Sequence, residues 1–112
     1  ATDVGGGTSF AMFRTLDEAY NIQQLKNHSL NPLASYFWST MGNAECLGLK
    51  DQIGSIKTGN FADLIILDSQ STSLMRHRME RCNTIEEELF ILQTLGDDRA
   101  IDSVFVAGKK RK

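Results

Sequence analysis

The apolar positions in the first part of the chain repeat with a helical period. They fall at i, i+1, i+4, i+7 and i+8 and form one stripe, which consists of Met12, Phe13, Leu16, Ala19 and Tyr20. Charged and amide side chains occupy the opposite side, which is typical of a helix that packs against a core. The pattern predicts a helix over about 9–26, with Thr8 or Ser9 placed to cap its first turn.

A second helical region is predicted to begin at Asn31-Pro32. Asparagine is a favourable N-cap, and proline at the first helical position loses no hydrogen bond. Apolar side chains then repeat at helical spacing as far as Met41, and Gly42 interrupts the pattern. We therefore expect a bent helical region that ends near Gly48.

The third predicted helix starts with a capping box, in which Thr84 is followed three residues later by Glu87. Neighbouring glutamates add favourable negative charge to the same turn. The residues that follow are apolar nearly all round the helix. Gly96 is expected to end the helix as the C′ residue, a position that commonly adopts the left-handed conformation.

Two short apolar runs, 64–67 and 104–106, predict strands. The first is continuously apolar, so we expect it to be covered on both faces. Residues 53–60 have turn chemistry, and residues 69–83 are polar and irregular, which predicts a loop or a weak helix. With only a strand end at 1–4 to join them, these strands cannot form a satisfactory sheet alone. We expect a fragment of a longer protein or an intimate oligomer.

The composition is that of an ordinary globular protein, with 41% hydrophobic and 23% charged residues and a net charge of −2. No overall field draws it to nucleic acid, and we interpret the basic end at 109–112 as a solvated tail. The sequence has no apolar run long enough for a bilayer and no signal pattern, which favours a cytoplasmic protein without a membrane partner. Cys46 and Cys82 are expected to be free thiols.

Asp3 is the leading candidate for chemistry. A carboxylate at the end of an apolar strand, before a glycine-rich turn into a helix, is where α/β barrels display catalytic groups, although many such aspartates only form turns. The run 5–8 could cradle an anion, but it lacks the ending of a P-loop, and we favour close packing beside Asp3. His28 and His77 have no partner at ligand spacing, so we expect them at the surface. Residues 97–99, Asp-Asp-Arg, predict a turn with a local ion pair.

Four segments together resemble the guanine deaminases of the zinc amidohydrolase superfamily. Residues 2–12, TDVGGGTSFAM, resemble the end of the eighth barrel strand and the helix after it. Residues 36–49 resemble a helical stretch of the family, and residues 53–64 resemble a strand start found in amidohydrolases generally. The run LGDDR at 95–99 is typical of guanine deaminases in particular.

The resemblance implies an α/β fold in two parts. Residues 1–50 would form the C-terminal part of a metal-dependent (β/α)₈ barrel, with the end of strand eight and the helices after it. Residues 51–112 would form the C-terminal strands and helix of a small β-sandwich. The implied reaction is hydrolysis of guanine to xanthine and ammonia by a zinc-activated water, with Asp3 as a metal ligand and as the catalytic carboxylate that accepts a proton.

The other metal ligands of that family lie upstream of this sequence, and one carboxylate cannot hold zinc. We therefore expect zinc and guanine to be the cofactor and substrate of an intact parent, and the isolated chain to bind no zinc tightly and to be inactive. Its expected partner is a second copy or the missing N-terminal part. The alternatives are another amidohydrolase, acting on a different aminated or halogenated ring, and a non-catalytic fragment that self-associates.

Overall fold

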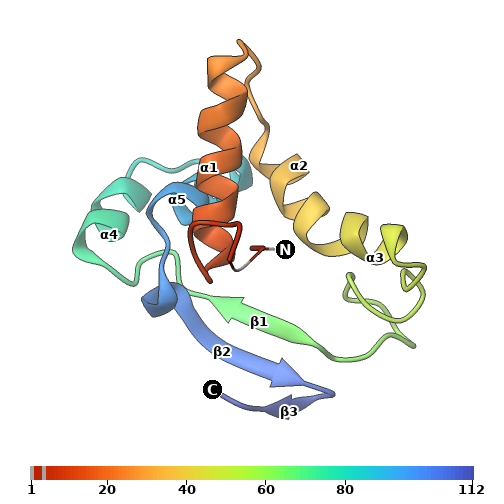
Figure 1. Cartoon of the computed structure of the whole chain (residues 1–112). Helices are drawn as coiled ribbons and strands as arrows, with labels where there is room; N and C mark the ends of the chain where they lie inside the picture. The colour runs from red at the N-terminus through yellow and green to blue at the C-terminus, as the bar shows by residue number, and fades with distance from the viewer. Residues whose placement is uncertain (1, 4) are drawn as a thin grey trace.

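The computed structural model describes residues 2–3 and 5–112 (Figure 1). Helices and strands are mixed along the chain, and Figure 1 shows the helices gathered on one side of a small sheet. The elements are α1 (Met12–Leu25), α2 (Pro32–Phe37), the π-helical turn η1 (Trp38–Gly42), α3 (Asn43–Cys46), β1 (Leu64–Leu67), α4 (Ser73–Met79), α5 (Ile85–Leu95), the 3₁₀ turn η2 (Asp98–Ala100), β2 (Ile101–Val106) and β3 (Lys109–Lys110).

The sheet has three antiparallel strands in the order β1-β2-β3. The strand predicted at 104–106 is longer than expected and begins at Ile101. The third strand comes from the basic end of the chain. The interpretation of 109–112 as a solvated tail was therefore wrong in part, since Lys109 pairs with Val106 and Lys110 with Phe105. The strand end expected at residues 1–4 is not part of this sheet as far as it is described. Thr2 and Asp3 lie in no strand, and the other two residues lie outside the described part.

Strand β1 is at an edge of the sheet and is only partly covered. It pairs with β2 on one side, and within the described residues no strand pairs with its other side. Ile65 and Ile66 are 53% and 47% exposed, so the expectation of a strand covered on both faces is wrong for this chain by itself. The strand keeps the apolar sequence of a buried element without the neighbours that would bury it.

Helix α1 begins three residues later than the sequence predicts, and neither expected residue caps it. Its N-cap is Ala11, which has no capping side chain. The Ser9 hydroxyl instead accepts from the backbone N–H of Ala11 at 3.0 Å. The Thr8 hydroxyl donates to the carboxylate of Glu18, farther along the helix. Both hydroxyls therefore shape the loop before α1.

The bent helical region is confirmed, and its cap is the one that the sequence predicts. The side chain of Asn31 accepts from the N–H of Leu33 at 2.8 Å. The bend is the π-helical turn η1, where the hydroxyls of Ser39 and Thr40 donate to backbone carbonyl groups one turn earlier, at 2.9 and 2.8 Å. Hydroxyls that bond back to helical carbonyls favour such distortions. The turn at Gly54 packs closely against the bend, since a Cβ there would lie 2.8 Å from Ala44 Cβ.

The capping box at the start of α5 is confirmed. Thr84 Oγ1 accepts from the N–H of Glu87 at 3.2 Å, and Glu87 Oε2 accepts from the N–H of Thr84 at 3.3 Å. The predicted role of Gly96 is wrong, because Gly96 is the C-cap and has an extended backbone with φ −69°. A side chain is excluded there for another reason: its Cβ would collide with the carbonyl oxygen of Leu92.

One core joins the two halves of the chain. It consists of Phe13 from α1, Met75 from α4, Ile91 and Leu92 from α5, and Ala100 from η2. Helices α1 and α2 both pack against α5. The position of α1 is thus set by contacts with the second half of the chain.

Candidate functional site

The loop that carries Asp3 folds around this residue. Asp3 has a left-handed backbone with φ 49°, and its carbonyl oxygen accepts from the N–H of Gly6 at 3.0 Å and from that of Gly7. A Cβ on Gly6 would lie 2.7 Å from Asp3 Oδ2, and a Cβ on Gly7 would collide with the carbonyl oxygen of Thr2. The glycines are thus needed for close approach, which confirms the predicted packing beside Asp3.

The carboxylate of Asp3 belongs to an exposed residue at the surface of this chain. No three side chains of the histidine, cysteine, aspartate and glutamate types come together as a metal site within residues 2–3 and 5–112. A catalytic zinc needs about three protein ligands. The described residues therefore do not fit a zinc ion by themselves.

The other candidate ligands lie apart at the surface. His28 and His77 are exposed, as expected, and His77 Nδ1 lies 3.3 Å from Glu80 on the next turn. Cys46 and Cys82 are free, which confirms the prediction of two thiols. The structure brings none of these residues to Asp3 as a metal-binding group.

The Asp-Asp-Arg run forms the predicted turn with a local ion pair. Asp97 caps η2 by accepting from the N–H of Arg99 at 2.9 Å, and the Arg99 guanidinium donates to both oxygens of that carboxylate at 2.5–3.1 Å. These hydrogen bonds hold the pKa of Asp97 below its ordinary value and raise the pKa of Arg99. The pair shapes the start of β2, and the carboxylate of Asp97 is bound by Arg99.

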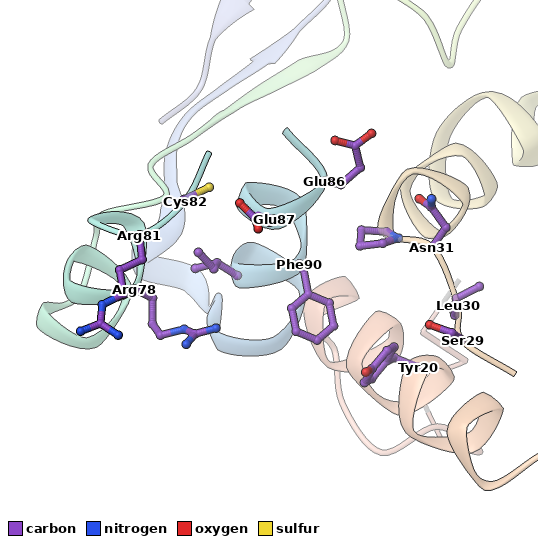
Figure 2. Close-up of a pocket in the computed structure, with 12 residues that line it drawn as sticks. Tyr20, Ser29, Leu30, Asn31, Arg78, Arg81, Cys82, Glu86, Glu87 and Phe90 are labelled. Atoms are coloured by element: carbon purple, nitrogen blue, oxygen red, sulfur yellow. The ribbon is translucent and has the colours of Figure 1, made fainter. Parts of the chain in front are cut away.

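A groove of about 550 Å³ lies between α1, α4, α5 and the segment before α2 (Figure 2). Tyr20 and Phe90 meet edge to face in it, with ring centroids 5.0 Å apart. Figure 2 shows Arg78 and Arg81 at one side and Asn31 at the other. The groove does not include Asp3 or its glycine loop. Sequence reasoning missed it, because its lining comes from segments that are far apart along the chain.

Burial affects one further titratable group. The hydroxyl of Tyr36 is buried where the helices meet, and among the described residues it has no hydrogen-bond partner. Desolvation raises the pKa of this hydroxyl well above its ordinary value. Tyr36 therefore stays neutral and acts as a core side chain. No helix in the described part of the chain is both long and apolar enough to cross a membrane.

The chain belongs to the amidohydrolase family, whose model matches residues 1–111. It is 38% identical over 108 residues to the guanine deaminase of Escherichia coli K12, an alignment that covers 96% of this chain and 25% of that protein. The chain thus spans about a quarter of the length of this curated relative.

Solved structures show the same relationship. The structure of E. coli guanine deaminase matches with a TM-score of 0.96 and 37% identity, over 100% of this chain and 26% of that one. Guanine deaminase from Bradyrhizobium japonicum matches with a TM-score of 0.88 and 29% identity, over 100% and 30% of the chains. An adenosine deaminase from Xanthomonas campestris with bound zinc matches with a TM-score of 0.68 and 25% identity, over 89% and 22%.

Proposed function

We propose that this chain is the C-terminal segment of a guanine deaminase-like hydrolase that converts guanine to xanthine and ammonia. The observation that carries the proposal is the match over the full length of the chain to E. coli guanine deaminase, with a TM-score of 0.96. The LGDDR run at 95–99 supports it, since this run is typical of guanine deaminases.

We further propose that residues 1–50 belong to a (β/α)₈ barrel and residues 51–112 to a small β-sandwich. The arrangement of elements supports this division, because α1, α2 and α3 lie in the first part and all three strands lie in the second. The shared core at α5 would then be the contact between barrel and sandwich.

Asp3 is the residue of this chain that we assign to the active site, as a catalytic carboxylate and as one ligand of a zinc ion. Its exposure and the tight glycine loop around it support the assignment. A single exposed carboxylate is a weak ligand, so the remaining ligands would have to come from outside this sequence. The isolated chain is accordingly proposed to bind no zinc tightly and to be inactive.

Exposed apolar surface supports a partner that covers this chain. Phe10, Leu25 and Ile56 are 84%, 85% and 94% exposed, and β1 has a free edge within the described residues. Large apolar side chains are more often buried than exposed in folded proteins. We propose that the upstream part of the enzyme, or a second copy, covers it. With a net charge of −2, the protein is proposed to act on a small molecule and not on nucleic acid. The proposed compartment is the cytoplasm, without a membrane partner.

A chimera tests the proposal. This chain replaces the matching quarter of E. coli guanine deaminase, and the production of xanthine from guanine is measured beside the unaltered E. coli enzyme. We expect turnover of guanine. A folded chimera without guanine turnover would contradict the proposal.

The similarity to an adenosine deaminase favours testing one alternative, an amidohydrolase that acts on another aminated ring. The same chimera is therefore assayed with adenosine. Because the match to guanine deaminase is much closer, we expect adenosine to be a poor substrate. A preference for adenosine over guanine would support the alternative.

A further inference from the structure

The glycine loop before α1 is tied to the body of that helix by one side-chain hydrogen bond. Thr8 Oγ1 donates to Glu18 Oε1, ten residues farther along the chain. Thr8 is exposed and Glu18 is half-buried. Within residues 2–3 and 5–112, no other side-chain hydrogen bond joins residues 5–10 to α1 itself. The loop is thus held at the side of the helix rather than at its first turn.

This tie matters because the loop has few other restraints. Gly5 has φ 107°, and within the described residues an added Cβ there would have no neighbour within 4 Å. Three successive glycines cost more conformational entropy to order than other residues. The remaining bonds are local: Gly6 and Gly7 donate to the carbonyl of Asp3. These local bonds set the shape of the loop but do not fix its direction relative to α1.

Helix α1 is a rigid support for the tie. Phe13 and Leu16 of this helix are 8% and 7% exposed, and Phe13 belongs to the core. The backbone of Glu18 is therefore held in place by the core, and its carboxylate is a strong acceptor for a hydroxyl donor. At the other end of the loop, the Asp3 carboxylate is so close to Gly6 that an added Cβ would lie 2.7 Å from Oδ2. A loop that moves therefore carries this carboxylate with it.

We propose that Thr8 and Glu18 are positioning residues. Their hydrogen bond holds the glycine loop against α1 and so keeps the Asp3 carboxylate in one orientation relative to this helix. The inference rests on the proposed function for the role of Asp3. Small errors in the placement of a catalytic group lower the rate of reaction far more than they lower stability.

The test uses the chimera with Thr8→Val and Glu18→Ala, which remove the donor and the acceptor. Each variant is expected to lower kcat about tenfold with little change in KM, because the reacting group is displaced while substrate binding persists. Thr8→Ser and Glu18→Gln keep a donor and an acceptor and should stay near the unaltered chimera. The double variant should be no worse than either single variant, since both remove the same bond.

Hydrogen exchange gives a readout that does not depend on activity. Peptides covering residues 5–12 should exchange faster in Thr8→Val and Glu18→Ala, with an unchanged melting temperature. Asp17→Ala is the matched control, because it removes the 3.6 Å ion pair with Arg14 on the same helix without touching the loop. It should alter neither kcat nor exchange in the loop.

The outcomes separate this inference from the proposed function. An unaltered chimera that folds but does not turn over guanine contradicts the function, and hydrogen exchange still decides whether the tie orders the loop. An active chimera in which Thr8→Val and Glu18→Ala keep their kcat and their slow exchange overturns the inference. Equal losses in Thr8→Ser and Thr8→Val would also overturn it, because the hydrogen bond would then not be the cause.

Discussion

Asp63 Oδ1 accepts a hydrogen bond from the backbone N–H of Ala107 at 2.7 Å, across 44 residues of the chain. It joins the residue before β1 to the turn between β2 and β3. Next to it, the N–H of Gly108 donates to the carbonyl of Ala62 at 3.0 Å. The two bonds tie the hairpin turn to β1, although β1 and β3 are not neighbours in the sheet.

This turn has a strained residue. Ala107 has φ 49° and Gly108 has φ 75°, the pair of left-handed residues that a type I′ hairpin requires. Asparagine adopts this conformation more readily than alanine, so Ala107→Asn should raise the free energy of unfolding by about 0.5 kcal/mol. Urea unfolding measures the change. Ala107→Val, which puts a β-branched residue at the same φ, should lower it, and the reverse order would contradict the assigned turn.

Substitutions at Gly96 are expected to destabilise the fold through the size of the added side chain and not through the backbone conformation. Its φ of −69° suits any residue, but a Cβ would collide with the Leu92 carbonyl. Gly96→Ala should therefore cost about 1–3 kcal/mol, as overpacking does. Gly96→Asn should be no better tolerated. Gly48, with φ 71° and open space around it, is the control, where asparagine should be better than alanine. An advantage for asparagine at Gly96 would restore the left-handed C′ interpretation.

The Asp97–Arg99 pair predicts a pH dependence. Arg99 lowers the pKa of Asp97 through its side-chain hydrogen bonds first and its backbone N–H second. Because the folded pKa is lower than the unfolded pKa, the stabilisation is present above the unfolded value and is lost as pH falls through the folded one. Arg99→Gln should raise the pKa of Asp97 part of the way back, as measured by carboxyl NMR. Arg14→Gln, on another helix, should leave it unchanged.

The free edge of β1 can be tested with two neighbouring prolines. Val104 uses its N–H and its carbonyl toward Lys112 and Arg111, on the β3 side. Its cross-strand neighbour Ile65 must then direct its own backbone groups away from β2, since two opposite residues of an antiparallel pair either exchange both hydrogen bonds or exchange none. Ile65→Pro should block pairing at the outer edge and spare the ladder, whereas Ile66→Pro should break the ladder.

Sedimentation and circular dichroism of the isolated chain give the readout. Ile65→Pro is expected to reduce self-association while helix content persists, and Ile66→Pro is expected to disturb the fold itself. An isolated chain that is monomeric at high concentration, and indifferent to Ile65→Pro, would show that β1 needs no partner.

The features that the sequence predicted correctly are those made by residues close together along the chain. The side chain of Asn31 accepts from the backbone N–H two residues later, and the capping box of Thr84 and Glu87 spans three residues. The Asp97–Arg99 pair closes within two. In each case the side chain and the backbone group that it satisfies lie in one turn, so no tertiary contact is needed to predict the bond.

The errors arise where a turn or a loop decides which groups meet. Lys109 and Lys110 look like a solvated tail, yet the two-residue turn at 107–108 folds them back to pair with β2. Thr8 looks like a helix cap, yet its hydroxyl bonds to Glu18. The path of the loop decides whether this hydroxyl reaches the first turn of α1 or the side chain of Glu18. Asp3 could be selected from its resemblance to a family, but its contact with Gly6 could not be predicted without that path.

We propose Asp3 as the catalytic residue that this chain contributes to a guanine deaminase-like enzyme. The most direct test is guanine turnover by the chimera with Asp3→Asn, which keeps the shape of the side chain but removes its charge and basicity. Asp51→Asn, an exposed aspartate in a turn, is the control. We expect a loss of about a hundredfold or more for Asp3→Asn and none for Asp51→Asn. Near-normal turnover by a correctly folded Asp3→Asn chimera would contradict it.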